Sequence, residues 1–190
     1  MKAFAATDVG VEREINQDCV YYSLTEVGPL PNLFIVADGM GGHKAGDFAS
    51  RYTVDNFVSK VRESSGKDTV DIIDDAVTRV NTALLEKAGE SPDYTGMGTT
   101  LVVATVIDNR LKVANVGDSR LYIVGNDIRQ ITRDHSLVEE MVSLGEIDRK
   151  AARTHKRKNI ITRAIGGDAK VEAEMFCVEL QPGDKILIHS

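Results

Sequence analysis

Long apolar segments and paired cysteines are both missing from this chain of 190 residues. No apolar run approaches the roughly 18 residues that a membrane-spanning helix requires, and the N-terminus MKAFAATDVG lacks the apolar stretch of a secretion signal. Cys19 and Cys177 lie far apart and form no C-x-x-C pair, so neither a zinc site nor a disulfide framework is predicted. We therefore expect a soluble, cytoplasmic protein with no membrane partner.

Several signatures of nucleotide binding and hydrolysis are also missing. The glycine-rich stretch GMGGHKAG lacks the Gly-Lys-Ser/Thr ending of a P-loop, and its glycine spacing does not match the dinucleotide pattern G-x-G-x-x-G. No G-x-S-x-G nucleophile motif occurs. The formal net charge of −6 argues against a nucleic-acid partner, and the basic stretch DRKAARTHKRKN is interpreted as a solvated face.

Proline is scarce, with four residues, and no low-complexity tract interrupts the chain, so a single domain over residues 1–190 is predicted. Apolar residues recur at helical spacing from Lys44 to Val61 and again from Val70 to Leu84, which predicts two amphipathic helices. Residues 135–155 also have an irregular helical pattern. The predicted strands occupy 2–8, 17–24, 33–38, 98–108, 111–116 and 120–124, and a final hairpin is predicted over 171–190.

Three aspartates beside turns or strand ends are candidates for a metal site. Asp38 ends the apolar run LFIVAD, Asp18 closes REINQD, and Asp118 lies in GDS, which the pattern predicts to be a hairpin turn. Mg²⁺ and Mn²⁺ prefer carboxylate and carbonyl oxygens, and glycines such as Gly39 would let a backbone carbonyl approach the ion. Aspartate is also common in turns, so each residue taken alone is better explained structurally.

Two other side chains have chemistry that suits a phosphate site. The guanidinium of Arg13 can bind a phosphate through two hydrogen bonds, although an exposed ion pair is the simpler interpretation. His43 can transfer a proton near neutral pH, or it can make a structural hydrogen bond at the start of a helix. The sequence leaves both alternatives open.

Six short segments in a fixed order carry a resemblance to a known family. They are TDVGVEREINQD, VADGMGGHKAG, MGTTL, NVGDSRLY, ITRDHSLV and NIITRAIG, which together span nearly the whole chain. In this order they resemble the metal-dependent serine/threonine protein phosphatases of the type 2C class (PPM family), in its compact bacterial form. The resemblance implies an α+β fold, a layered α-β-β-α sandwich of two mostly antiparallel sheets flanked by helix pairs.

The resemblance also implies a role for single residues. Asp38 would bridge two Mn²⁺ or Mg²⁺ ions, the Gly39 carbonyl would bind one of them, and Asp18 would hold metal-bound water. Asp118 would bind a third, weaker ion, and Arg13 would bind the substrate phosphate. A water bridging the two core ions would attack the phosphorus of phosphoserine or phosphothreonine in a protein, without a phosphoenzyme. A serine/threonine protein kinase and its targets are the implied partners.

Two features depart from the family pattern. Met40 stands where animal relatives have the histidine that protonates the leaving oxygen, so His43 becomes the candidate general acid. The family's strand corresponding to KILIHS continues into a metal-binding Asp-Gly, and this chain ends at Ser190. We therefore expect the last strands and two metal carboxylates to be missing, with weak or no turnover. A flap insertion is expected at 143–165.

Two alternatives remain at this point. The first is a non-catalytic, phosphatase-like binding or regulatory module that recognises a phosphoprotein. The second is a fragment that another chain completes by strand exchange, because exposed sheet edges invite pairing.

Overall fold

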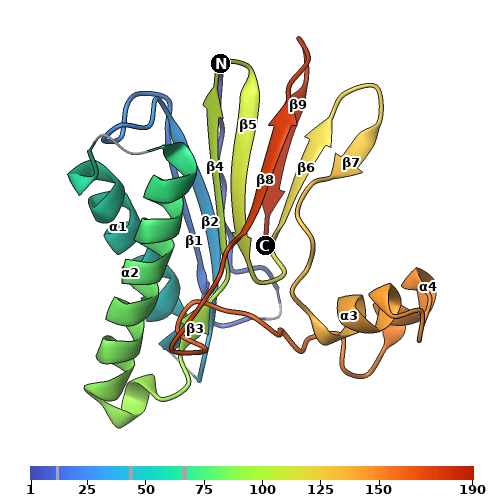
Figure 1. Ribbon diagram of the computed structural model, residues 1–190. Helices are drawn as coiled ribbons and strands as arrows, with labels where there is room; N and C mark the ends of the chain where they lie inside the picture. The colour runs from blue at the N-terminus through green and yellow to red at the C-terminus, as the bar shows by residue number, and fades with distance from the viewer. Residues whose placement is uncertain (12, 43–44, 66–67) are drawn as a thin grey trace.

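Two antiparallel sheets form the centre of the molecule (Figure 1). The computed structural model describes residues 1–11, 13–42, 45–65 and 68–190. The larger sheet has the order β1-β2-β4-β5-β8, with β3 beside β2, and the smaller sheet has the order β7-β6-β9. The larger sheet consists of β1 (Asp18–Ser23), β2 (Leu33–Met40), β3 (Gly98–Thr99), β4 (Leu101–Ile107), β5 (Arg110–Val116) and β8 (Glu174–Glu179). The smaller sheet consists of β6 (Arg120–Val124), β7 (Ile128–Gln130) and β9 (Lys185–His189).

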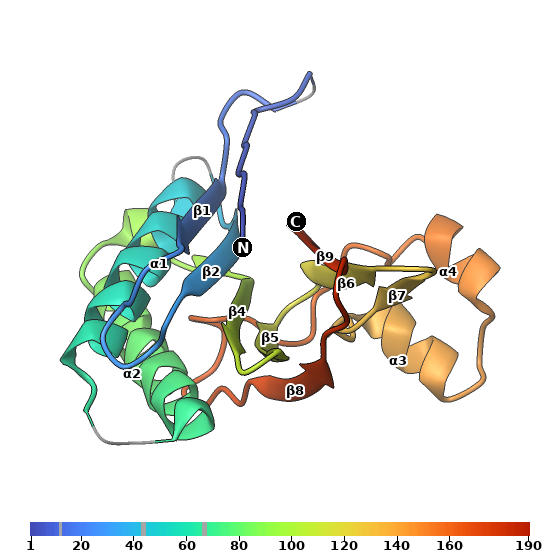
Figure 2. The ribbon, with the colours of Figure 1, turned by 90° about the horizontal axis from the view of Figure 1, so that it is seen from above.

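Two long helices cover one face of the larger sheet, as Figure 2 shows from above. They are α1 (Ala45–Glu63) and α2 (Thr69–Gly89), which confirms both helical patterns in the sequence. The side chain of Asp68 accepts a hydrogen bond from the Val70 N–H and so begins α2. The helices and the sheet share one buried cluster, which includes Phe57, Val61, Ile73, Val77, Leu84, Leu33, Ile35 and Ala37.

A second buried cluster fills the space between the two sheets. Its members are Val102, Ala104, Leu111, Val113, Leu121 and Ile123. Because side chains alternate along a strand, Ala37 faces the helices while its neighbour Asp38 faces the space between the sheets. The register of β2 therefore places a half-buried carboxylate at the edge of an apolar layer.

The α+β prediction with two mostly antiparallel sheets is confirmed, but three local predictions are wrong. Residues 2–8, all of them described, form no strand, and Phe4 is 90% exposed. The expected hairpin over 171–190 does not form, because β8 pairs with β5 while β9 pairs with β6 in the other sheet. Asp118 lies in a corner between two sheets rather than in a hairpin turn. Alternation predicts a strand but carries no information about its partner.

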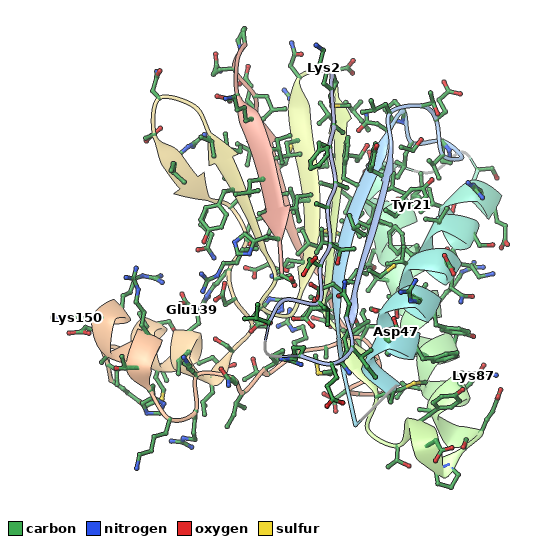
Figure 3. All side chains as sticks on the ribbon, turned by 180° about the vertical axis from the view of Figure 1, so that it is seen from behind. Lys2, Tyr21, Asp47, Lys87, Glu139 and Lys150 are labelled. Atoms are coloured by element: carbon green, nitrogen blue, oxygen red, sulfur yellow. The ribbon has the colours of Figure 1, made fainter. Side chains whose placement is uncertain are left out.

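Two short helices form a separate lobe beside the sheets. We call residues 137–160 the side lobe; it contains α3 (Leu137–Ser143) and α4 (Arg149–Thr154). Both Arg149 Nη atoms donate to the Glu139 carboxylate, at 3.0 and 3.1 Å, which joins the two helices. Figure 3 shows Glu139 and Lys150 in the side lobe, on the opposite side of the molecule from the helices that carry Asp47 and Lys87.

A short 3-10 helix, η1 (Pro92–Tyr94), follows α2 and leads into β3. Within the residues that the structure describes, no helix combines the length and the apolar character needed to cross a membrane.

Candidate metal centre

Two carboxylates face each other across the first two strands. The antiparallel register of β1 and β2 pairs Asp18 directly with Asp38. Directly opposite residues project from the same face with Cβ atoms about 4.5–5.5 Å apart, and like charges in this arrangement repel. The Asp18 N–H donates to Oδ1 of Asn16 at 3.0 Å, which fixes the start of the strand. A strand pair that places two anions together is suited to a cation between them.

The backbone of Asp38 is held at both of its polar atoms. Its N–H donates to the Thr100 hydroxyl at 2.8 Å, and its carbonyl accepts from the Thr100 N–H at 2.9 Å and from the Thr99 hydroxyl at 2.9 Å. Thr99 and Thr100 are completely buried. The strand is therefore anchored at the residue where the carboxylate emerges.

A third carboxylate comes from the corner between β5 and β6. The corner consists of Gly117, Asp118 and Ser119, and the φ angle of Gly117 is 105°, which a side chain would disfavour. The Ser119 and Thr100 hydroxyls lie 2.7 Å apart and share a hydrogen bond. Thr100 thus connects the Asp38 strand to the Asp118 corner.

The electrostatics of these carboxylates show how closely they converge. Burial and the neighbouring charges of Asp18 and Asp118 raise the pKa of Asp38 from 3.8 to about 6, against the opposing effect of Arg13. Burial and the charge of Asp134 raise the pKa of Asp118. Asp38 therefore experiences two neighbouring carboxylates and one guanidinium, and a divalent cation would neutralise the excess negative charge.

The donor set fits a hard divalent ion. All the converging donors are oxygens, as Mn²⁺ and Mg²⁺ require. Among the described residues, however, no three His, Cys, Asp or Glu side chains are close enough to hold an ion by themselves. The directly paired Asp18 and Asp38 are therefore taken as the core of the centre. His43 lies outside the described residues.

The guanidinium of Arg13 lies beside this centre. Its side chain is exposed, and its Nη1 donates to Oε1 of Gln17 at 3.3 Å. The hydroxyl of Ser190 donates to Oδ2 of Asp18 at 2.9 Å, so the end of β9 also reaches the acidic pair. Asp18, Asp118 and Arg13 all influence the pKa of Asp38. Their roles as site residues stay predictions.

The glycine after Asp38 is also required by packing. A Cβ on Gly39 would lie 1.9 Å from the carbonyl oxygen of Gly46, and a Cβ on Gly46 would lie 2.6 Å from the Gln17 side chain. Both glycines are required because β2 and the start of α1 approach backbone to backbone. A side chain at either position would push the strand away from the helix.

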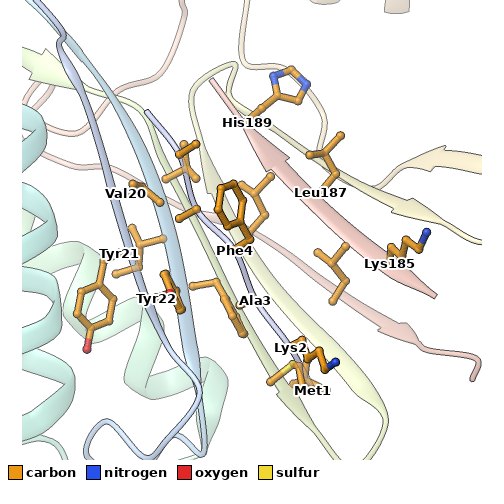
Figure 4. Close-up of a pocket in the computed structure, with 18 of the residues that line it drawn as sticks. Met1, Lys2, Ala3, Phe4, Val20, Tyr21, Tyr22, Lys185, Leu187 and His189 are labelled. Carbon is orange, nitrogen blue, oxygen red and sulfur yellow. The ribbon is translucent and has the colours of Figure 1, made fainter. Parts of the chain in front are cut away.

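A cavity of about 1090 Å³ lies between the N-terminal segment, β1 and β9, and it reaches Asp18 and Ser190. Figure 4 shows Phe4 and Tyr22 on one side of this space and Leu187 on the other. Its wall is largely apolar, while Asp18 supplies charge at its border. This arrangement separates an apolar surface from the polar centre.

Sequence reasoning did not identify two residues that organise the centre. Thr100 lies within the quoted segment MGTTL, and His135 within ITRDHSLV, yet neither was assigned a role. Thr100 is hydrogen-bonded across 62 residues to Asp38, and the Gly117 N–H donates across 18 residues to Nδ1 of His135. No local pattern reveals contacts of this range.

Comparison with known proteins gives consistent matches. The family model described as protein phosphatase 2C matches residues 17–166. The chain is 42% identical over 195 residues to serine/threonine phosphatase stp of Listeria monocytogenes, covering 100% of this chain and 77% of that protein.

Solved structures agree with this match. The fold is similar to the serine/threonine phosphatase Stp1 of Staphylococcus aureus, with a TM-score of 0.85, 36% identity, and 92% of this chain and 70% of that chain covered. It is also similar to the catalytic domain of the serine/threonine protein phosphatase PstP in complex with two manganese ions. That match has a TM-score of 0.81 and 33% identity, and it covers 96% of this chain and 74% of the PstP chain.

Proposed function

This chain belongs to the protein phosphatase 2C family, and we propose on that basis that it removes phosphate from phosphoserine and phosphothreonine residues of proteins. The reaction depends on Mn²⁺ or Mg²⁺, in line with the two manganese ions in the similar PstP structure. The observation that carries the proposal is the facing pair of Asp18 and Asp38, whose repulsion a divalent ion relieves. A binding module without chemistry has no need for this strained pair.

We propose a separate role for each residue of the centre. We propose that the Asp38 carboxylate and the Gly39 carbonyl hold the core ions, and that Asp18 orients water beside them. Bound ions of this type lower the pKa of water and neutralise charge on phosphate oxygens. Asp118 is proposed to bind a third, weaker ion, because it comes from the corner between the two sheets and not from the facing strand pair.

We propose that Arg13 binds the substrate phosphate. Its guanidinium is close enough to Asp38 to lower the pKa of that carboxylate, yet its side chain is exposed to solvent. It can therefore turn toward an incoming phosphate and form two parallel hydrogen bonds with it. We retain His43 as the candidate donor of the proton to the leaving oxygen, since a group that titrates near neutral pH suits that step.

The surroundings of the centre suggest where the substrate protein lies. We propose that residues 143–165, which include α4 of the side lobe, act as the flap beside the site, within one domain over residues 1–190. A serine/threonine protein kinase that phosphorylates the same substrates is the proposed partner. The free thiols of Cys19 and Cys177 are compatible with the reducing cytoplasm, which we propose as its location.

The experiment is Mn²⁺-dependent hydrolysis of a phosphothreonine peptide, compared between the wild type, Asp38→Asn and Asp71→Asn. Asp71 is an exposed residue in the first turn of α2, so its substitution controls for the loss of one negative charge. We expect Asp38→Asn to lower turnover by about 10³-fold, since several kcal/mol of charge stabilisation are lost. Asp71→Asn should behave like the wild type.

The alternative of a non-catalytic module predicts another outcome. Wild type, Asp38→Asn and Asp71→Asn would then bind the phosphopeptide with similar affinity and release no phosphate above background. Turnover that survives Asp38→Asn would also contradict the proposed centre.

A further inference from the structure

The corner that carries Asp118 is clamped by a buried histidine, and we propose that His135 is the positioning residue for the Asp118 carboxylate. The inference rests on the proposed function in one respect, because it takes Asp118 as a ligand of the weaker ion. His135 does not touch Asp118. It acts on the peptide group immediately before it.

His135 binds both polar backbone atoms of Gly117. The Gly117 N–H donates to Nδ1 of His135 at 3.1 Å, and the Gly117 carbonyl accepts from the His135 N–H at 2.9 Å. His135 is only 8% exposed, so water does not compete effectively for these groups. The ring therefore holds the peptide group before Gly117, and the His135 N–H holds the peptide group that joins Gly117 to Asp118. Together they set the direction in which the Asp118 side chain leaves the corner.

The hydrogen bonds of the two ring nitrogens are consistent with one tautomer of the neutral ring. Nε2 lies 3.1 Å from Oε2 of Glu174 on β8. Because Nδ1 accepts a hydrogen bond, the proton of a neutral ring is on Nε2, which then donates to Glu174. Burial, together with the charges of Arg163 and Arg133, lowers the pKa of His135, in agreement with a neutral ring. Glu174 thereby keeps Nδ1 free to accept from Gly117.

The residues around His135 hold the corner from a second side. Nε and Nη2 of Arg120, just beyond the corner, donate to the two carboxylate oxygens of Asp134 at 2.9 and 2.6 Å. The side-chain amide of Asn115, just before the corner, donates to the Arg133 carbonyl at 2.8 Å. Segment 133–135 is therefore hydrogen-bonded to residues on both sides of the corner, and His135 makes the hydrogen bonds nearest to Asp118 in the sequence.

The same residue also anchors the base of the side lobe. The Thr162 N–H donates to the His135 carbonyl at 2.9 Å, and Ser136 forms an isolated β-bridge with Ile161. A change in the position of the side lobe is thus transmitted to the Gly117 peptide through one residue. His135 couples the base of the lobe to the direction of the Asp118 side chain.

Two substitutions separate the contacts of the ring. His135→Asn places an amide oxygen near the position of Nδ1 and retains an acceptor for Gly117, whereas His135→Gln reaches the Nε2 position and retains only the contact with Glu174. Each variant loses one ring contact, so each controls for the other. We expect fast hydrogen exchange of the Gly117 amide in His135→Gln and slow exchange in His135→Asn, both measured in EDTA.

The affinity for Mn²⁺ should differ between His135→Gln and His135→Asn in the same way as the exchange rate. Loss of a supporting hydrogen bond around a ligand typically costs about 10- to 100-fold in metal affinity. We expect His135→Gln to weaken the weaker class of Mn²⁺ sites by about tenfold, and His135→Asn to leave it near the wild-type value. Equal exchange rates and equal Mn²⁺ affinities in the two variants would overturn the proposal.

A measurement on the wild-type protein guards against variants that fail to fold. An N–H···N hydrogen bond gives a scalar coupling between its two nitrogens in NMR, and we expect one between Gly117 N and His135 Nδ1. Its absence overturns the proposal. Asp118→Asn shows which of the two proposed roles fails. If it leaves Mn²⁺ binding unchanged, the role of Asp118 as an ion ligand is wrong. If it weakens Mn²⁺ binding and His135→Gln does not, the role of His135 is wrong.

Discussion

Asp38 and Asp118 reach the same centre by different means. Asp38 lies within a strand whose register pairs it with Asp18, and Thr99 and Thr100 hold its backbone N–H and carbonyl. Asp118 lies at a corner between two sheets, where Thr100, Ser119 and His135 make the supporting hydrogen bonds. Strand register therefore sets the direction of the Asp38 side chain, whereas the hydrogen bonds around a corner set that of Asp118.

Thr100 connects the Asp38 side of the centre to the Asp118 side. Among the hydrogen-bonding side chains that support the two carboxylates, its loss should lower stability and turnover the most. Thr100→Val keeps the shape but leaves the Asp38 N–H and the buried Ser119 hydroxyl without their partner. We expect about 2 kcal/mol of destabilisation in urea unfolding and about a tenfold loss of Mn²⁺-dependent turnover.

Thr105→Val, in the strand β4 that begins just after Thr100, is the matched control. The Thr105 hydroxyl is equally buried and donates to the Asn32 carbonyl at 2.8 Å, away from the carboxylates. It should cost a similar free energy of unfolding while leaving the turnover of the folded protein unchanged. Equal losses of turnover in both variants would show that Thr100 contributes only to stability.

Ser119→Ala affects only the Asp118 side of this connection and should have a smaller effect. Thr100 retains its hydrogen bond to Asp38, so the facing pair stays in place. We expect about 1 kcal/mol of destabilisation and a loss of affinity confined to the weaker Mn²⁺ class, measured by calorimetry. Weakening of the tight class as well would mean that the two sides are not separable.

The smallest predicted effect concerns the metal-free protein. Because the pKa of Asp38 rises from 3.8 to about 6 on folding, the stability from this group is fully present below about pH 4 and is lost as the pH rises through 6. Asp38→Asn should therefore be more stable than the wild type in EDTA at pH 7, by about 1 kcal/mol after allowance for partial exposure. A stability difference that does not vary between pH 4 and pH 7 would contradict this account.

The sequence predicted the elements of the fold better than their partners. The helical periods of α1 and α2 and the apolar run of β2 are local signals, so they could be read directly. The separation of β8 from β9, and the corner at Asp118, depend on pairing between distant strands, which no local pattern specifies. Residues 2–8 are predicted as a strand but form none.

The candidate site, like the fold, could be predicted only in part from the sequence. Arg13, Asp18, Asp38 and Asp118 were proposed because motif order places chemistry-bearing residues in a known arrangement, and their roles stay predictions. Thr100 escaped notice because a threonine in a buried strand has an ordinary structural explanation. The prediction that these 190 residues turn over weakly stays a prediction, as does the role of His43, which lies outside the described residues.

Calorimetric titration with Mn²⁺ of the wild type, Asp38→Asn and Asp118→Asn tests the division between the two sides most directly. The account predicts a tight and a weak class of sites in the wild type. Asp38→Asn should abolish the tight class, and Asp118→Asn should remove only the weak one. Loss of the tight class in Asp118→Asn, or its survival in Asp38→Asn, would contradict the claim that the facing pair of Asp18 and Asp38 forms the core of the centre.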